Sequence, residues 1–316
     1  MFVGEILSSC GTDLEPEVFP NRTIENIETY PISGISTPDW CKRIFVSDTE
    51  VYYYDSNSSG SVETGGYQMV VLNLLTGEST NIPLIVDNDE ELSYLLELLN
   101  RNVAEFGGSC WYEGKGYVIG REKSFIYAPE TKTWSIVMNN YDDLGNYDYK
   151  ETSNVLVYKN EMIQISSRRM YIYSFASNRW TSRPMTHDFM FEGSATLMSD
   201  GDNLYALNGR EGVLFVYEDS SNLWKEKMTL YGNELNGGAV KIMIDGSLFY
   251  VLSDNSSLAR QWDASNNTIT LLKVGPLFSH PYYYYAGMEN MFNIKSTGYI
   301  LGYDGSMTYL MKFNLK

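Results

Sequence analysis

Four arginines could bind anions, and their spacing follows the strand-like segments of the chain. They lie in the segments GREKS, SSRRM and NGREG, as Arg121, the pair Arg168 and Arg169, and Arg210. Each group follows, by two to four residues, an apolar run that ends at Ile119, Ile165 or Leu207. A guanidinium is planar and can pair with a carboxylate through two hydrogen bonds. The pattern therefore predicts a ligand-binding face for an anionic group.

The overall charge leaves a second interpretation of these arginines open. The chain of 316 residues has 40 acidic and 23 basic side chains, a net charge of −17. Each arginine could therefore pair with a neighbouring carboxylate and serve only the fold. A surface of this sign repels nucleic acids and anionic membranes at long range, so we expect neither as a partner.

Other chemistries find less support in the residue types. The two histidines, His187 and His280, belong to no HxH, HExxH or Cys/His cluster, so we expect no metal site. No nucleotide-binding or serine-nucleophile motif occurs, so we expect no cofactor and no catalytic residue. The three cysteines show neither CxxC spacing nor an even count, which predicts reduced thiols.

Two further groups could carry function. Acidic residues gather in the expected loops, as Asp142, Asp143, Asp148, Asp188 and Glu192, and paired carboxylates can act on sugars. An enzyme that processes or binds glycans therefore remains an alternative. The other group is a run of tyrosines in an expected loop, Tyr282, Tyr283, Tyr284 and Tyr285. Tyrosine is favoured at protein interfaces, so this run predicts a contact surface.

A repeat must position these residues. The segment 116–134, GYVIGREKSFIYAPETKTW, returns in part as YIYSFASNRW, FVYEDSSNLW and ARQWDASNNTI. The final residues of these phrases, Trp134, Trp180, Trp224 and Ile269, are 46, 44 and 45 residues apart. Such a period, filled with short strands, predicts an all-β fold, a β-propeller of about six four-stranded blades.

The repeated phrase resembles the kelch repeat. In kelch blades an apolar strand ends in a glycine pair, and the next strand ends in an aromatic residue before a polar turn and a tryptophan. The places of the glycine pair are taken here by Gly120-Arg121, Ser166-Ser167, Asn208-Gly209, Ser253-Asp254 and Gly302-Tyr303. The resemblance implies a propeller over residues 40–316. It also implies that arginines after the second strand of a blade, as here, read acidic peptides.

The N-terminal segment 1–39 is predicted to close the ring. The last repeat stops at Lys316 after its third strand, while Ile24 to Ile32, IENIETYPI, reads like a fourth strand. A blade that takes strands from both ends of the chain removes free sheet edges. One helix is expected as an insertion at 87–103, and its leucine face is predicted to pack on the propeller.

These features predict a non-catalytic, kelch-like propeller that mediates protein–protein interaction. It would serve as a recognition module or as a structural component of a larger assembly, such as a virus or phage particle. The expected partner is a protein, with an acidic segment as the candidate ligand. No signal-peptide pattern and no long apolar run occur, which predicts a cytoplasmic or intracellular protein, or a virion component.

Overall fold

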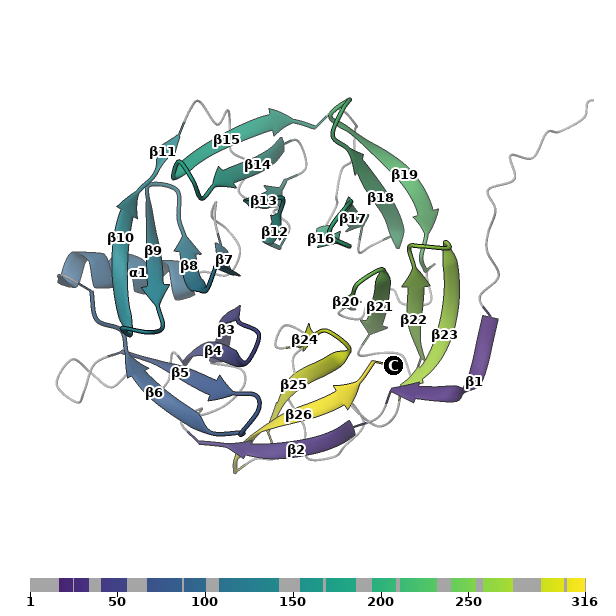
Figure 1. The fold of residues 1–316 in the computed structure, drawn as a ribbon, viewed down its shortest axis with the longest axis horizontal. Helices are drawn as coiled ribbons and strands as arrows, with labels where there is room; N and C mark the ends of the chain where they lie inside the picture. The colour runs from purple at the N-terminus through teal and green to yellow at the C-terminus, as the bar shows by residue number, and fades with distance from the viewer. Residues whose placement is uncertain are drawn as a thin grey trace, which may run out of the picture.

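The computed structural model describes residues 17–24, 26–33, 41–55, 67–86, 88–100, 108–141, 154–166, 169–185, 195–208, 211–231, 240–253, 258–274, 291–303 and 306–315. These residues form six sheets, each built on four antiparallel strands and set around a ring (Figure 1). The innermost strand of each sheet lies near the middle of the ring, and the outermost strand follows the circumference. The predicted fold class, a six-bladed β-propeller, is confirmed.

The first three blades follow one another along the chain. Blade 1 contains β3 (Cys41–Val46), β4 (Glu50–Asp55), β5 (Gln68–Asn73) and β6 (Ser79–Pro83). Blade 2 contains β7 (Gly108–Tyr112), β8 (Lys115–Ile119), β9 (Lys123–Ala128) and β10 (Thr133–Met138). Blade 3 contains β12 (Leu156–Tyr158), β13 (Glu161–Ile165), β14 (Arg169–Ser174) and β15 (Arg179–Pro184), and the short β11 (Asn140–Tyr141) pairs with β15.

The other three blades complete the ring. Blade 4 contains β16 (Ala195–Ser199), β17 (Leu204–Asn208), β18 (Val213–Glu218) and β19 (Leu223–Thr229). Blade 5 contains β20 (Val240–Asp245), β21 (Leu248–Ser253), β22 (Leu258–Asp263) and β23 (Thr268–Val274). Blade 6 contains β24 (Phe292–Ile294), β25 (Thr297–Tyr303) and β26 (Thr308–Asn314), together with a strand from the N-terminal segment.

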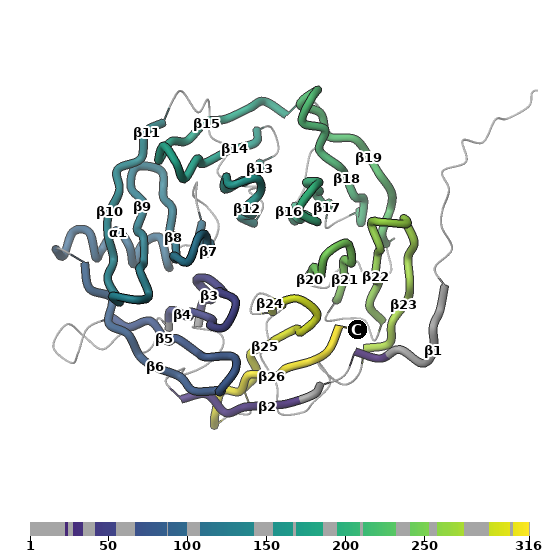
Figure 2. The backbone as a smooth tube through the Cα atoms, in the orientation of Figure 1, coloured from purple at the N-terminus to yellow at the C-terminus, as the bar shows by residue number. Residues whose placement is uncertain are grey.

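That strand is β2 (Asn26–Ile32), which pairs antiparallel with β26 and joins the two ends of the chain in one sheet (Figure 2). The predicted closing strand began two residues too early. Ile24 ends a separate strand, β1 (Glu17–Ile24), which pairs parallel with β23 of blade 5. The reason is packing, because Ile24 is buried among apolar residues of blades 5 and 6.

The hydrophobic core lies between neighbouring blades. Six apolar clusters of the described residues each join one blade to the next around the ring. Large aromatic side chains such as Trp180, Trp224 and Trp262 are fully buried in them. Burial of this kind is the main stabilising term in folding, and here it also sets the angle between adjacent blades.

The register of the outer strands explains the repeated phrase. Trp134, Trp180, Trp224 and Ile269 lie opposite Tyr127, Tyr173, Tyr217 and Trp262 on the third strand of their blades. Two residues before each of them the backbone has a positive φ, at Lys132, Asn178, Asn222 and Asn267. Asparagine tolerates this conformation better than most residues, which explains why it recurs in these turns.

One helix, α1 (Asp89–Asn100), packs on blades 1 and 2. Leu95 and Leu99 are buried in the cluster between these blades, and Lys123 Nζ forms an ion pair with Glu91 Oε1 at 2.8 Å. The side chain of Asn88 accepts a hydrogen bond from the Glu91 N–H, so this cap fixes the start of the helix. Within the described ranges, no helix is long and apolar enough to cross a membrane.

Candidate functional site

Arg121 lies in the turn between β8 and β9, where its side chain is exposed. Its guanidinium carbon is 5.2 Å from the centre of the Tyr141 ring. Tyr141 belongs to β11 and pairs with Trp180 of blade 3. A guanidinium that stacks on an aromatic ring keeps the N–H groups at its edge free for other partners.

Arg169 begins β14 and is half-buried. Its Nε and Nη2 donate hydrogen bonds to Ser182 Oγ at 3.0 Å and 2.6 Å. Ser182 lies two residues beyond Trp180 on β15, so both side chains project from the same face of that strand. This face is turned toward blade 2, because Trp180 packs against Ile119.

A buried polar network joins the turn of Arg121 to blade 3. The backbone carbonyl of Gly120, next to Arg121, accepts hydrogen bonds from Trp180 Nε1 at 3.0 Å and from Asn139 Nδ2 at 2.8 Å. Asn139 Oδ1 accepts further bonds from Ser124 Oγ at 2.9 Å and from the Tyr173 hydroxyl at 3.1 Å. Buried groups that satisfy one another in this way hold the turn of Arg121 against blade 3.

Arg121 and Arg169 therefore both lie where blades 2 and 3 meet, but not in contact. Tyr141, which Arg121 covers, is opposite Trp180, and Arg169 is opposite Pro184, four residues farther along β15. We call Arg121, Tyr141, Arg169 and Ser182 the arginine site. Neither guanidinium forms an ion pair with a described residue, and both are oriented by uncharged groups. Two positive charges with free donor groups can bind a carboxylate or another oxyanion.

Several predicted residues lie outside the described residues. These are Arg168 and Arg210 of the arginine row, the tyrosines Tyr282 to Tyr285, the loop carboxylates Asp142, Asp143, Asp148, Asp188 and Glu192, and both histidines. Among the described residues, no group of three or more His, Cys, Asp or Glu side chains could hold a metal ion. Burial raises the pKa of the Cys110 thiol to about 12, so this thiol stays protonated at neutral pH.

The glycine-pair positions of the repeat have local explanations. A Cβ added at Gly120 would lie 2.8 Å from the Tyr94 hydroxyl of α1 and 3.0 Å from the Lys123 carbonyl oxygen, so α1 and β9 pack closely on this position in blade 2. In blade 3 the equivalent residue is Ser166, whose Oγ accepts the Arg169 N–H at 3.2 Å. In blade 4 it is Asn208, whose Oδ1 accepts the Glu211 N–H at 3.4 Å. The serine and asparagine thus stabilise their turns through side-chain hydrogen bonds.

Sequence reasoning missed the two neutral partners, Tyr141 and Ser182. A signal existed for Ser182, because period-two alternation along RWTSRP places it on the face of Trp180. No comparable signal exists for Tyr141, which reaches Arg121 through the short strand β11 that enters blade 3 from blade 2.

No protein-family model and no curated protein matches the sequence. Among solved structures, the chain is similar to a catalytically inactive virginiamycin B lyase from Staphylococcus aureus with quinupristin. The two share 11% sequence identity over 92% of this chain and 100% of that one, with a TM-score of 0.50. YCF48 bound to D1 peptide is 10% identical over 96% of this chain and 98% of that chain, with a TM-score of 0.49. The β-propeller domain of Cps50 (Swd1) from Myceliophteria thermophila is 8% identical over 87% and 84%, at 0.45. Such low identities describe the fold alone.

Proposed function

We propose that this chain is a non-catalytic, kelch-like propeller that binds another protein, and that its arginine site contacts an acidic segment of that partner. One observation carries the proposal. Arg121 and Arg169 are held at one junction by a tyrosine ring and a serine hydroxyl, in a chain with 40 acidic residues. Acidic neighbours are plentiful, so guanidiniums that serve only the fold would be expected to meet carboxylates.

The hydrogen-bond inventory supports a bidentate ligand. A guanidinium has five N–H donors, and Arg169 directs its Nε and Nη2 toward Ser182. No described residue accepts a hydrogen bond from its Nη1 group or from Arg121, whose guanidinium carbon lies 5.2 Å from the centre of the Tyr141 ring. A carboxylate offers two oxygen acceptors in the plane that such an edge requires.

The net charge of the chain limits where an acidic ligand can bind. An acidic ligand is repelled at long range by a protein at −17, so only a local concentration of positive charge can hold it. The proposal extends to Arg168 and Arg210 as further ligand-binding residues, and to Tyr282, Tyr283, Tyr284 and Tyr285 as a separate interface.

The biological setting follows as part of the same proposal. The propeller, with residues 1–39 closing the domain of residues 40–316, acts inside a cell or in a virion, as a recognition module or a structural component of an assembly. Nucleic acids and membranes are not its partners. The glycan-acting alternative stays a sequence-based prediction, because the loop carboxylates on which it depends lie outside the described residues.

Peptide binding tests this proposal. We would titrate the protein into a fluorescein-labelled peptide of alternating glutamate and serine, and into the same peptide with glutamine in place of glutamate, and follow fluorescence anisotropy. We expect binding of the glutamate peptide only, weakened by added salt as exposed charge pairs are. Equal affinity for both peptides, or no binding of the glutamate peptide, would contradict the proposal that the arginine site binds acidic segments.

A further inference from the structure

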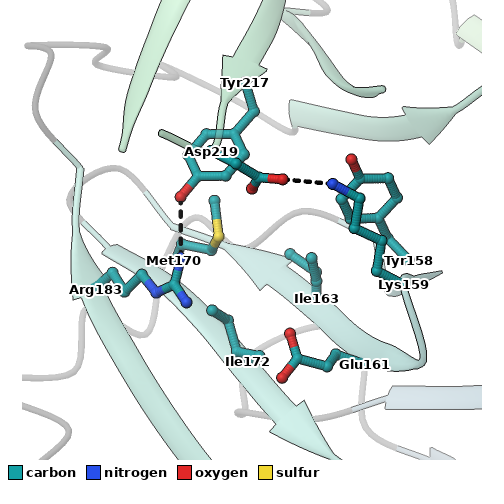
Figure 3. Close-up of a pocket in the computed structure, with 9 residues that line it drawn as sticks. All are labelled: Tyr158, Lys159, Glu161, Ile163, Met170, Ile172, Arg183, Tyr217 and Asp219. Atoms are coloured by element: carbon teal, nitrogen blue, oxygen red, sulfur yellow. Dashed lines mark hydrogen bonds and ion pairs between the residues drawn. The ribbon is translucent and has the colours of Figure 1, made fainter. Parts of the chain in front are cut away.

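A second site lies at the next junction of the ring, between blades 3 and 4. There the structure has a pocket of about 350 Å³ that shares no residue with the arginine site (Figure 3). Its floor is apolar and consists of Ile163, Met170 and Ile172 of blade 3. Its volume is at the small end of the range for pockets that bind small ligands.

The two tyrosines of the pocket contribute their rings, because their hydroxyl groups are already engaged. The Tyr158 hydroxyl donates to the backbone carbonyl of Asp202 at 2.8 Å. The Tyr217 hydroxyl donates to Asn222 Oδ1 at 2.7 Å and accepts a bond from Arg183 Nη1 at 3.3 Å. The Tyr158–Asp202 and Arg183–Tyr217 hydrogen bonds connect blade 3 to blade 4 at the pocket.

The pocket has four charged side chains among the described residues, of which two form an ion pair with each other and two do not. Lys159 Nζ and Asp219 Oδ2 form an ion pair at 2.5 Å across the blade junction, and each side chain is about half exposed. The carboxylate of Glu161 has no partner among the described residues. Arg183 meets only the neutral Tyr217 hydroxyl there. One negative and one positive group thus remain for a ligand.

These two groups lie at opposite ends of the pocket. Glu161 is opposite Ser174 on β14, and Arg183 is opposite Met170 on the same strand. Their α-carbons are therefore separated by four residues along β14, about 13 Å, and by two strand spacings, about 10 Å. Figure 3 shows Ile172 in the space between them.

We infer that the pocket binds a dipolar ligand of the short-peptide class. A cationic group of the ligand lies beside Glu161, an apolar side chain packs on Ile163, Met170 and Ile172, and an anionic group lies beside Arg183. Each charged group of the ligand then pairs with Glu161 or Arg183, neither of which forms an ion pair with a described residue. The apolar part of the ligand packs on the apolar side chains of the pocket. The same chemistry occurs in a free tripeptide and in a segment of a longer chain.

Two probes distinguish these sources. One is the tripeptide Ala-Leu-Ala with free termini, and the other is acetyl-Lys-Leu-Glu-amide, in which side chains carry the charges. Titration calorimetry on the full chain would measure both. Binding of the first alone assigns the pocket to free peptides, binding of the second alone to segments of proteins, and binding of both to the shared chemistry. Binding of neither overturns the inference.

Charge variants test the orientation. Glu161→Gln and Arg183→Gln should each weaken the binding probe roughly fivefold, whereas Glu130→Gln, an exposed change in blade 2, should have no effect. Capped peptides test which charge meets which residue. N-acetylated Ala-Leu-Ala should bind the unaltered protein more weakly than free Ala-Leu-Ala, but Glu161→Gln should bind the two peptides equally. C-terminally amidated Ala-Leu-Ala should likewise bind the unaltered protein more weakly, while Arg183→Gln should bind the amidated and free peptides equally. If both variants and both capped peptides bind like their parents, the inference is wrong. The capped peptides decide alone if a variant fails to fold.

Discussion

The indole Nε1 of Trp180 in blade 3 donates a hydrogen bond of 3.0 Å to the backbone carbonyl of Gly120 in blade 2. This bond connects the tryptophan that marks the sequence repeat to the turn that carries Arg121. The repeat therefore does more than fill the core, because it also fixes the turn of one blade against the outer strands of the next.

The value of this bond can be measured against a matched tryptophan. Trp180 and Trp224 are both buried and occupy equivalent places, but Trp224 Nε1 has no hydrogen-bond partner among the described residues. Replacing either with phenylalanine removes similar volume. We expect Trp180→Phe to lose about 1 kcal/mol more stability than Trp224→Phe, because only the former breaks a hydrogen bond. Urea unfolding would measure both losses, and equal losses would show that the bond contributes nothing.

Ring closure by β2 predicts a large effect of an N-terminal deletion. Removing residues 1–33 leaves the edge of β26 unpaired and removes Ile32, which is buried between blades 6 and 1. We expect a much lower melting temperature or aggregation, because an unpaired edge can pair with another chain. Removing residues 1–22 keeps β2 and Ile24 and should cost far less. A protein without residues 1–33 that melts like the full chain would exclude closure as a source of stability.

Asp200 predicts a pH dependence of stability. Burial raises the pKa of its carboxyl, but hydrogen bonds from Asn203, Tyr205 and the Asp202 N–H outweigh burial and hold the pKa below its ordinary value. Because the folded pKa is the lower one, the carboxylate stabilises the fold above the unfolded value of about 3.9. That contribution is lost as the pH falls through the folded pKa.

Asp200→Asn should therefore cost about 1 to 2 kcal/mol at neutral pH and almost nothing in strong acid. Thermal unfolding across pH would follow the difference from the unaltered protein. Asp202→Asn, in the same exposed turn, is the control, because no described residue pairs with its carboxylate. A cost for Asp200→Asn that stays constant down to the lowest pH would contradict the hydrogen-bond account.

The fold was largely predictable because its repeat is local. The turn asparagines and the tryptophans at Trp134, Trp180 and Trp224 recur at a fixed period, and the structure places them in register. The place of Ile24 was not predictable, because its strand pairs parallel with β23, where Ile24 is opposite Val274, 250 residues away in sequence. The start of α1 depends on the Asn88 cap rather than on the leucine pattern.

The sites were less predictable than the fold, because a site depends on which blades meet. Period-two alternation places Ser182 and Arg183 on opposite faces of β15. It does not show that Ser182 meets Arg169 while Arg183 meets Tyr217 of the next blade. The first contact follows from the register of β14 and β15 within blade 3. The second follows from the packing of blade 3 on blade 4, which the sequence pattern of a single blade does not contain.

Charge reversal at the arginine site tests the central claim most directly. We would measure the affinity of the labelled glutamate–serine peptide for Arg121→Glu/Arg169→Glu and for Lys115→Glu/Lys132→Glu. The control makes the same change in net charge, at two exposed lysines. Both are in blade 2, where Lys115 is the first residue of β8, the strand that precedes Arg121. We expect the arginine variant to bind about tenfold more weakly than the control, or worse. Its melting temperature should be lower than that of the control, because Arg169 loses two hydrogen bonds to Ser182, so affinity is compared at a temperature at which both variants are folded. Equal affinity of the two variants for the acidic peptide would contradict the arginine site as a protein-binding face.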